Sequence, residues 1–259
     1  MKIILASLFA ITMLATAGFA INKISAVVSP SGVSVNVPNV AVEKSLALEP
    51  GSLQRTVFIH YREGFAKGKG NGKSPCSKLL GVKWKSFPIS YVVHPDLEAK
   101  DAGAIHASAE TWDAATSREL FNTPTFNATA NWDSNAPDLK NELSLGNYPE
   151  DGVIAVTIVW AGIPIGGKGL QIIEYDILFD TDYNWGDAGP TSETSLGNTS
   201  VMDLENIATH EKGHGVGEDD IYDGSCTEVT MFGLSENGET KKRTLATADI
   251  SGLQKMYGV

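Results

Sequence analysis

The sequence is poor in cysteine and in positive charge and has no visible internal repeat, and these absences exclude several classes of protein. Two cysteines in 259 residues cannot build a disulfide-dense miniprotein or a four-thiolate zinc site, although they can form one disulfide. Lysine and arginine number 20 against 31 aspartates and glutamates, so the net charge of −11 argues against nucleic-acid binding. The remaining composition, 42% hydrophobic and 20% charged, suits one domain with a real core.

One mostly apolar run, residues 3–21, follows Met1-Lys2 at the start of the sequence. Small residues at 15–17 and 18–20 resemble signal-peptidase sites, whereas the length of the run would also allow an uncleaved membrane anchor. We expect residues 1–20 to be a signal peptide and the protein to be secreted, without stable membrane insertion. A disulfide can persist in such an oxidising compartment.

Residues 21–78 differ in composition from the chain that follows. Residues 33–37 and 56–61 alternate like short strands, and residues 64–73 are rich in glycine and lysine, as a solvated tether would be. We predict that 21–78 is an N-terminal segment or propeptide. The alternative is that residues 56–61 add an edge strand to the main sheet of the domain.

Residues 79–259 have the hydrophobic periodicity of a compact domain, in which Trp112 is expected to be a core residue. The expected strands are 87–93, 153–159 and 170–179, and the expected helices are 101–121, a segment from about 201, and 247–257. Elements in this order predict an α+β domain.

The strongest chemical signal is a pair of histidines on the helix that starts near residue 201. His210 and His214 are four residues apart, so both imidazoles point at one spot and can give a zinc ion its first two ligands. Glu211 can reach a metal-bound water without being a ligand itself. The chance alternative is a helix with two surface histidines and a solvated glutamate.

The residues after the second histidine can supply a third ligand. Gly215 and Gly217 are expected to end the helix, because glycine adopts left-handed backbone angles at low cost. The chain can then reverse and bring Asp220 back toward the metal, leaving the fourth position to water. Asp219 is the alternative ligand, and Asp220 is preferred for its spacing of three residues after Gly217.

The stretch His210–Asp220 resembles the extended zinc signature of the metzincin metallopeptidases, H-E-x-x-H-x-x-G-x-x-H/D, in the minority form with aspartate last, as in snapalysin-like enzymes. Thr230-Met231-Phe232-Gly233 resembles the Met-turn of that clan, in which Met231 would lie beneath the zinc. Residues 245–258 resemble the closing helix of the matrixins. The likeness covers roughly residues 85–259, and similar secreted peptidases occur in bacteria and archaea.

This resemblance implies a metzincin-like zincin domain with a twisted mixed sheet, an active-site helix and a C-terminal helix. It also implies a monomeric zinc endopeptidase in which Glu211 acts as the general base. Residues 173–179, followed by Trp185, resemble the matrixin strand that borders the substrate cleft. A peptide or protein substrate is therefore expected along Ile172, Ile173, Glu174 and Tyr175.

The departures from the family pattern limit this interpretation. The five histidines, at 60, 94, 106, 210 and 214, cannot assemble the three-histidine structural zinc site of vertebrate matrixins. Gly233 stands where some metzincins have a tyrosine. Asp180, Asp182 and Asp187 could hold calcium, as in that family, or form an acidic solvated loop.

Two other functions remain open. A thermolysin-type zinc peptidase would take its third ligand from a downstream glutamate, with Glu228, Glu236 and Glu239 as candidates, but would leave Gly217, Asp220 and Met231 without a role. A surface interaction module could keep the fold without catalysis.

Cys76 precedes the predicted catalytic domain, and Cys226 lies between Asp220 and Met231. We predict a disulfide between Cys76 and Cys226 that ties the N-terminal segment to the rim of the site. The rival is a Cys76 thiolate that blocks the zinc.

Overall fold

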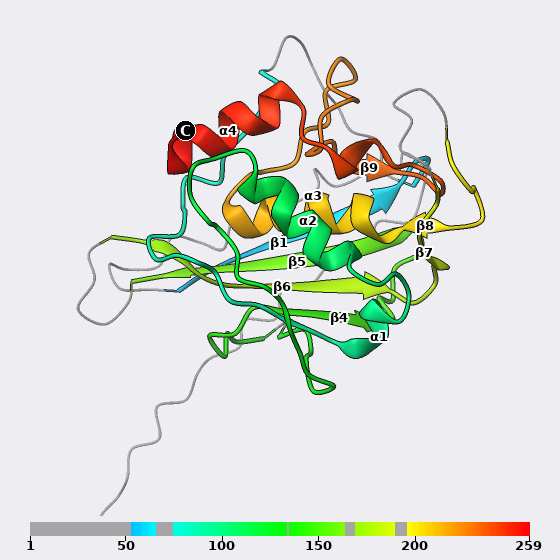
Figure 1. Cartoon of the computed structure of the whole chain (residues 1–259), viewed down its shortest axis with the longest axis horizontal. Helices are drawn as coiled ribbons and strands as arrows, with labels where there is room; N and C mark the ends of the chain where they lie inside the picture. Colours follow the sequence, from blue (N-terminus) through cyan, green and yellow to red (C-terminus); the bar gives the residue numbers. More distant parts are fainter. Residues whose placement is uncertain (1–52, 66–74, 134, 164–168, 190–195) are drawn as a thin grey trace, which may run out of the picture. The chain divides into compact units, whose positions relative to one another are not determined.

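The computed structural model describes residues 53–65, 75–133, 135–163, 169–189 and 196–259 (Figure 1). The predicted signal peptide, the expected strand at 33–37 and most of the tether lie outside these ranges. None of the helices in this described part has the length and apolar character that a membrane span needs.

A mixed sheet of seven strands forms the centre of the described chain. In order across the sheet these are β3 (Thr125–Phe126), β2 (Val92–Val93), β4 (Glu142–Gly146), β6 (Gln171–Asp180), β5 (Val153–Gly162), β1 (Gln54–Arg62) and β9 (Leu234–Ser235). β5 runs antiparallel to both of its neighbours, and the other pairs are parallel. The short strands β7 (Trp185–Gly186) and β8 (Met202–Asp203) form a second, parallel pair.

Helices pack against this sheet and complete the core. They are α1 (Pro95–Glu98), α2 (Ala104–Asp113), α3 (Leu204–Val216) and α4 (Thr247–Tyr257), with a 3-10 turn, η1, at Lys241–Arg243. α3 contacts β5 and β6, and α2 packs on α3 (Figure 1). Trp112 is buried between the two helices and its indole N–H donates to the carbonyl of Thr209 at 2.8 Å, so it is the core residue that was expected.

The predicted α+β class with a mixed sheet agrees with the structure, which is compatible with a metzincin-like domain. The helix predicted at 247–257 has those bounds. The strand predicted at 87–93 shrinks to β2, although Ile89, Tyr91 and Val93 are buried in alternation as expected.

The helix predicted at 101–121 spans 21 residues, whereas α2 has only 10. α2 ends at Asp113, whose carboxylate accepts hydrogen bonds from the N–H groups of Leu120 and Phe121. This side chain folds the following residues back, so Leu120 is buried from a loop rather than from a helix.

Residues 172–175 do not lie in an edge strand of the sheet, and their contact with a substrate stays a prediction. They lie in β6, which has β5 on one side and β4 on the other. On the side away from β5, the Tyr175 N–H donates to Asn141 Oδ1 at 2.8 Å and the Ile172 N–H donates to the Lys83 carbonyl at 3.1 Å. The order of strands along the chain therefore did not give their order in the sheet.

Residues 56–61 form part of β1, which pairs with β5 along nearly its whole length and with β9 at Tyr61 and Arg62. The alternative in which this segment joins the main sheet therefore describes the structure, with β1 as an inner strand rather than an edge strand (Figure 1). The propeptide role of 21–78 stays a prediction.

A disulfide joins Cys76 to Cys226, as expected, with the two Cα atoms 5.4 Å apart. The residues after Cys76 lie beside the residues that follow the C-terminal end of α3. The Leu80 N–H donates to the carbonyl of Gly217, and the Asp219 N–H donates to the carbonyl of Lys78. Because both thiols are used in this bond, Cys76 is not the thiolate blocker that was its rival role.

Candidate metal centre

Helix α3 carries the two histidines, and local signals fix both of its ends. The Asp203 side chain accepts the N–H of Asn206 at 2.9 Å and caps the N-terminus. Gly217 ends the helix with φ of 107°, as predicted, because a side chain there would be strained. Gly215 was also expected to end the helix, but it lies inside α3. Its lack of a side chain leaves room there for the ring of Tyr175.

The structure brings His210, His214 and Asp220 together in a buried position. Asp220 Oδ1 lies 3.3 Å from His210 Nε2 and 3.5 Å from His214 Nε2. Ligand atoms held tetrahedrally at zinc-bond lengths lie about 3.3–3.5 Å from one another. All three atoms are buried without a hydrogen-bond partner in the described structure. The donor set and its spacing therefore fit a zinc ion.

The main chain sets the tautomers of both histidines. His210 Nδ1 lies 2.7 Å from the carbonyl of Thr230, and His214 Nδ1 lies 3.0 Å from the carbonyl of Glu218. A carbonyl oxygen can only accept, so each Nδ1 carries the proton and each Nε2 keeps a free lone pair. Metal-binding histidines use this arrangement, with the second nitrogen held by an acceptor.

The two adjacent aspartates have different partners. The Asp219 carboxylate forms an ion pair with Lys78 at 2.6 Å, whereas Asp220 faces the histidines and accepts a 3.0 Å hydrogen bond from the Tyr222 hydroxyl. Burial acts against ionisation of Asp220, but His214 and His210 outweigh it and hold the pKa of this carboxyl well below its ordinary value. Asp220 is thus the aspartate in position to be a ligand, in its charged form.

Glu211 lies beside the ligand set and is fully buried. Its Oε2 accepts a hydrogen bond from the Thr157 hydroxyl at 2.5 Å, and its Oε1 lies 3.0 Å from Nδ1 of His60. Burial raises the pKa of Glu211, because a carboxylate loses its hydration there. Neither Thr157 nor His60 was predicted to contact Glu211. The sequence shows His60 in an alternating strand, but alternation does not tell which residue a side chain faces.

Met231 packs against α3, and its predicted place beneath a zinc ion stays a prediction. It is fully buried, and a side chain on Gly213 would overlap with its sulfur. The Asp249 carboxylate accepts the N–H groups of Thr230, Met231 and Ala246 at 2.9, 3.3 and 2.9 Å. α4 is thereby tied to the turn beneath the histidines.

Other predicted acidic residues are engaged elsewhere. Glu228 and Glu239, candidates for a thermolysin-type ligand, form ion pairs with Lys241 and Lys242, respectively. In the described part of the chain, the three proposed calcium ligands do not form a metal-binding group: Asp187 pairs with Arg243, and Asp180 accepts the N–H of Asp182. A different group of acidic residues, Asp133, Asp138 and Glu174, has its carboxylate oxygens within 4.8 Å of one another.

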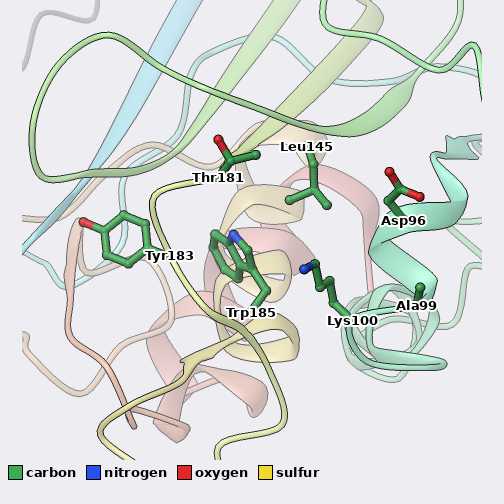
Figure 2. A pocket seen from close by; sticks show the side chains of 7 residues that line it. All are labelled: Asp96, Ala99, Lys100, Leu145, Thr181, Tyr183 and Trp185. Atoms are coloured by element: carbon green, nitrogen blue, oxygen red, sulfur yellow. The ribbon is translucent and has the colours of Figure 1, made fainter.

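A pocket of about 470 Å³ lies where β4 and β6 end near α1 (Figure 2). Figure 2 shows the side chain of Lys100 reaching toward Trp185 across it. None of the metal-ligand candidates lines this pocket.

Known proteins similar to this chain are metalloendoproteinases. No protein-family model matches the sequence. Metalloendoproteinase 1 from Glycine max is 36% identical over 81 residues, covering 31% of this chain and 25% of that protein. Metalloendoproteinase 2-MMP from Arabidopsis thaliana is 33% identical over 110 residues, covering 42% and 25%. Matrilysin from Homo sapiens is 33% identical over 112 residues, covering 43% and 35%.

The chain thus spans 25–35% of the length of these relatives. Their names and partial similarity support a matrixin-like relationship. The closer likeness to prokaryotic and snapalysin-like enzymes stays a prediction.

Proposed function

We propose that the chain is a zinc-dependent endopeptidase with His210, His214 and Asp220 as metal ligands. The observation that carries the proposal is the convergence of three buried ligand atoms, without other partners in the described structure, beside the carboxylate of Glu211. The similarity to metalloendoproteinases supports the same activity.

A zinc ion at this site would supply a water of lowered pKa and polarise a peptide carbonyl. Glu211 would accept the proton of the attacking water at its carboxylate and pass it to the leaving amine. The Thr157 hydroxyl, bonded to Oε2, orients that carboxylate. Burial raises the pKa of Glu211, which suits a group that must hold a proton between the two transfers.

We further propose that the protein is secreted and acts as a monomer on peptide or protein substrates, with residues 1–20 as signal peptide. The disulfide between Cys76 and Cys226 supports an oxidising compartment. The propeptide role of residues 21–78 belongs to the same proposal, because such segments keep secreted peptidases inactive until release.

The test measures the zinc content of the secreted protein and its hydrolysis of casein after release of the N-terminal segment. We expect one zinc per chain and hydrolysis that a chelator abolishes. Glu211→Gln should keep the zinc but lower turnover by about 10²–10⁴-fold, because an amide cannot accept the proton. Glu205→Gln on the same helix is the control and should change neither property. A protein without zinc, or a fully active Glu211→Gln variant, would refute the proposal.

A further inference from the structure

Two asparagines of the chain stand in N-glycosylation sequons, Asn-x-Ser/Thr with x other than proline. The two sequons are Asn127-Ala128-Thr129 and Asn198-Thr199-Ser200. In a secreted protein, a sequon in a surface loop is an acceptor for an N-linked glycan. Such triplets also arise by chance, so the exposure and the hydrogen bonds of each asparagine decide which of them can be modified.

Asn127 lies on the surface directly after β3 and is exposed together with Ala128 and Thr129. Its Oδ1 accepts hydrogen bonds from the Thr129 N–H at 2.9 Å and from the Thr129 hydroxyl at 3.0 Å. Because a backbone N–H can only donate, these bonds fix which end of the amide is the oxygen. The nitrogen Nδ2, which would carry the sugar, has no hydrogen-bond partner among the described residues and is left available by the turn.

The second sequon is attached to other loops at both of its ends. The Asn198 N–H donates to the carbonyl of Ala188 at 2.6 Å, and the Ser200 carbonyl accepts the side-chain amide of Asn184 at 3.1 Å. The side chain of Thr129, by contrast, bonds only to Asn127 within its own turn. An acceptor segment has to enter the active site of a transferase, so the sequon with the less restrained end is the better acceptor.

β3 is an edge strand that a glycan on Asn127 would cover. In the described sheet its only neighbour is β2. The N–H groups of Thr125 and Asn127 donate inward, to the carbonyls of Tyr91 and Val93 at 3.2 and 3.1 Å. Successive residues of a strand alternate, so the main-chain groups of Phe126 face outward, and its side chain is 51% exposed. An open edge with an exposed aromatic side chain can pair with another chain, and a bulky, soluble group beside it prevents this.

We propose that Asn127 carries an N-linked glycan that covers the open edge of the sheet at β3. In the transfer step, Nδ2 of Asn127 forms a bond to the anomeric carbon of a lipid-pyrophosphate-linked oligosaccharide. The bond from that carbon to the pyrophosphate oxygen breaks, the lipid pyrophosphate leaves with the electron pair, and Nδ2 loses one proton. The inference rests on the proposed secretion, because this transfer takes place on the non-cytoplasmic side of a membrane.

The test is mass spectrometry of the full-length protein secreted by the cells that naturally produce it. We expect the peptide that contains Asn127 to carry the mass of a glycan, and fragmentation to place that mass on this residue. Asn127→Gln and Thr129→Ala should each lose the glycan completely. Thr129→Ser is the matched control and should keep it, because the hydroxyl that the sequon requires is still present.

A second measurement compares the elution of the wild type and Asn127→Gln in size-exclusion chromatography. The variant should shift to larger species, because its edge strand is uncovered, and the double variant Phe126→Lys, Asn127→Gln should elute again as a single smaller species, because a charge on an edge strand opposes pairing. Zinc content and casein hydrolysis should be unchanged in the variants that stay soluble, since none of these residues belongs to the metal centre.

An unmodified Asn127 in the secreted protein, including a protein glycosylated on Asn198 alone, would overturn the proposal and leave the zinc peptidase proposal intact. An unmodified protein that stays inside the cell would overturn the proposed secretion as well. A glycosylated wild type whose Asn127→Gln variant elutes as smaller species only would overturn the covering of the edge strand.

Discussion

The hydroxyl of Tyr222 donates a 3.0 Å hydrogen bond to Oδ2 of Asp220, whose other oxygen faces the two histidines. The Tyr222 ring packs against Gly233, where any side chain would overlap with it. Gly233 is the position at which some metzincins carry a tyrosine. Here the tyrosine comes from the loop after Asp220, and its hydroxyl holds that carboxylate in place.

Tyr222→Phe is expected to weaken zinc binding without unfolding the protein. The change leaves one oxygen of Asp220 without its donor, and loss of such a supporting hydrogen bond costs about 10-fold or more in metal affinity. Chelator competition measures the effect. Tyr61→Phe loses an exposed hydrogen bond to Glu150 and is the control. Equal zinc affinity in wild type and Tyr222→Phe would contradict the role given to this hydroxyl.

Asp220→Ala and Asp219→Ala should behave differently. Removing Asp220 takes away a ligand and a negative charge, so the zinc content should fall well below one per chain. Removing Asp219 breaks an ion pair with Lys78, whose side chain is 57% exposed, and should cost about 0–1 kcal/mol of stability with zinc retained. Metal analysis and thermal unfolding of both variants decide the matter. Zinc loss confined to Asp219→Ala would reverse the assignment.

Gly213→Ala should destabilise the protein by about 1–3 kcal/mol, because the added methyl group overlaps with the sulfur of Met231 and the ring of Trp112. Both of these neighbours are fully buried and cannot move into solvent. Gly224→Ala is the control, since no atom lies within 4 Å of its added methyl. Equal unfolding temperatures for the two variants would show that Met231 is not packed against α3 in this way.

Glu174→Gln should stabilise the protein above neutral pH. Burial raises the pKa of Glu174 from 4.5 to about 7, so the folded state binds this proton more tightly than the unfolded state. This contribution to stability is present below about pH 4.5 and is lost as the pH rises to about 7. Glutamine can still accept the N–H of Leu139 and carries no charge near Asp133 and Asp138.

Thermal unfolding at pH 5 and pH 8 tests this prediction. The variant should gain about 1 kcal/mol, or about 3 °C, at pH 8 and almost nothing at pH 5. Glu228→Gln, with a side chain 70% exposed, serves as the control at both values. A variant that is less stable at pH 8 would contradict the buried position of Glu174.

The sequence by itself determined the parts of the site that depend on short spacings. Two histidines four apart lie on one helix face in any α-helix, and Gly217 ends that helix because of its own backbone freedom. The reversal that brings Asp220 back spans three residues, so it also follows from local geometry. Helix α4 was predictable with both ends from its periodicity.

Only the tertiary structure decided which strands are neighbours and what faces the histidines. Strand pairing joins residues far apart in sequence, such as Phe58 and Thr157, and alternation gives each strand two faces without naming its partners. The inner position of residues 172–175 in the sheet and the contact of His60 with Glu211 could not be foreseen for this reason. Helix spacing placed His210 and His214 on one face of α3, whereas the long-range pairing of β1 with β5 decided what covers them.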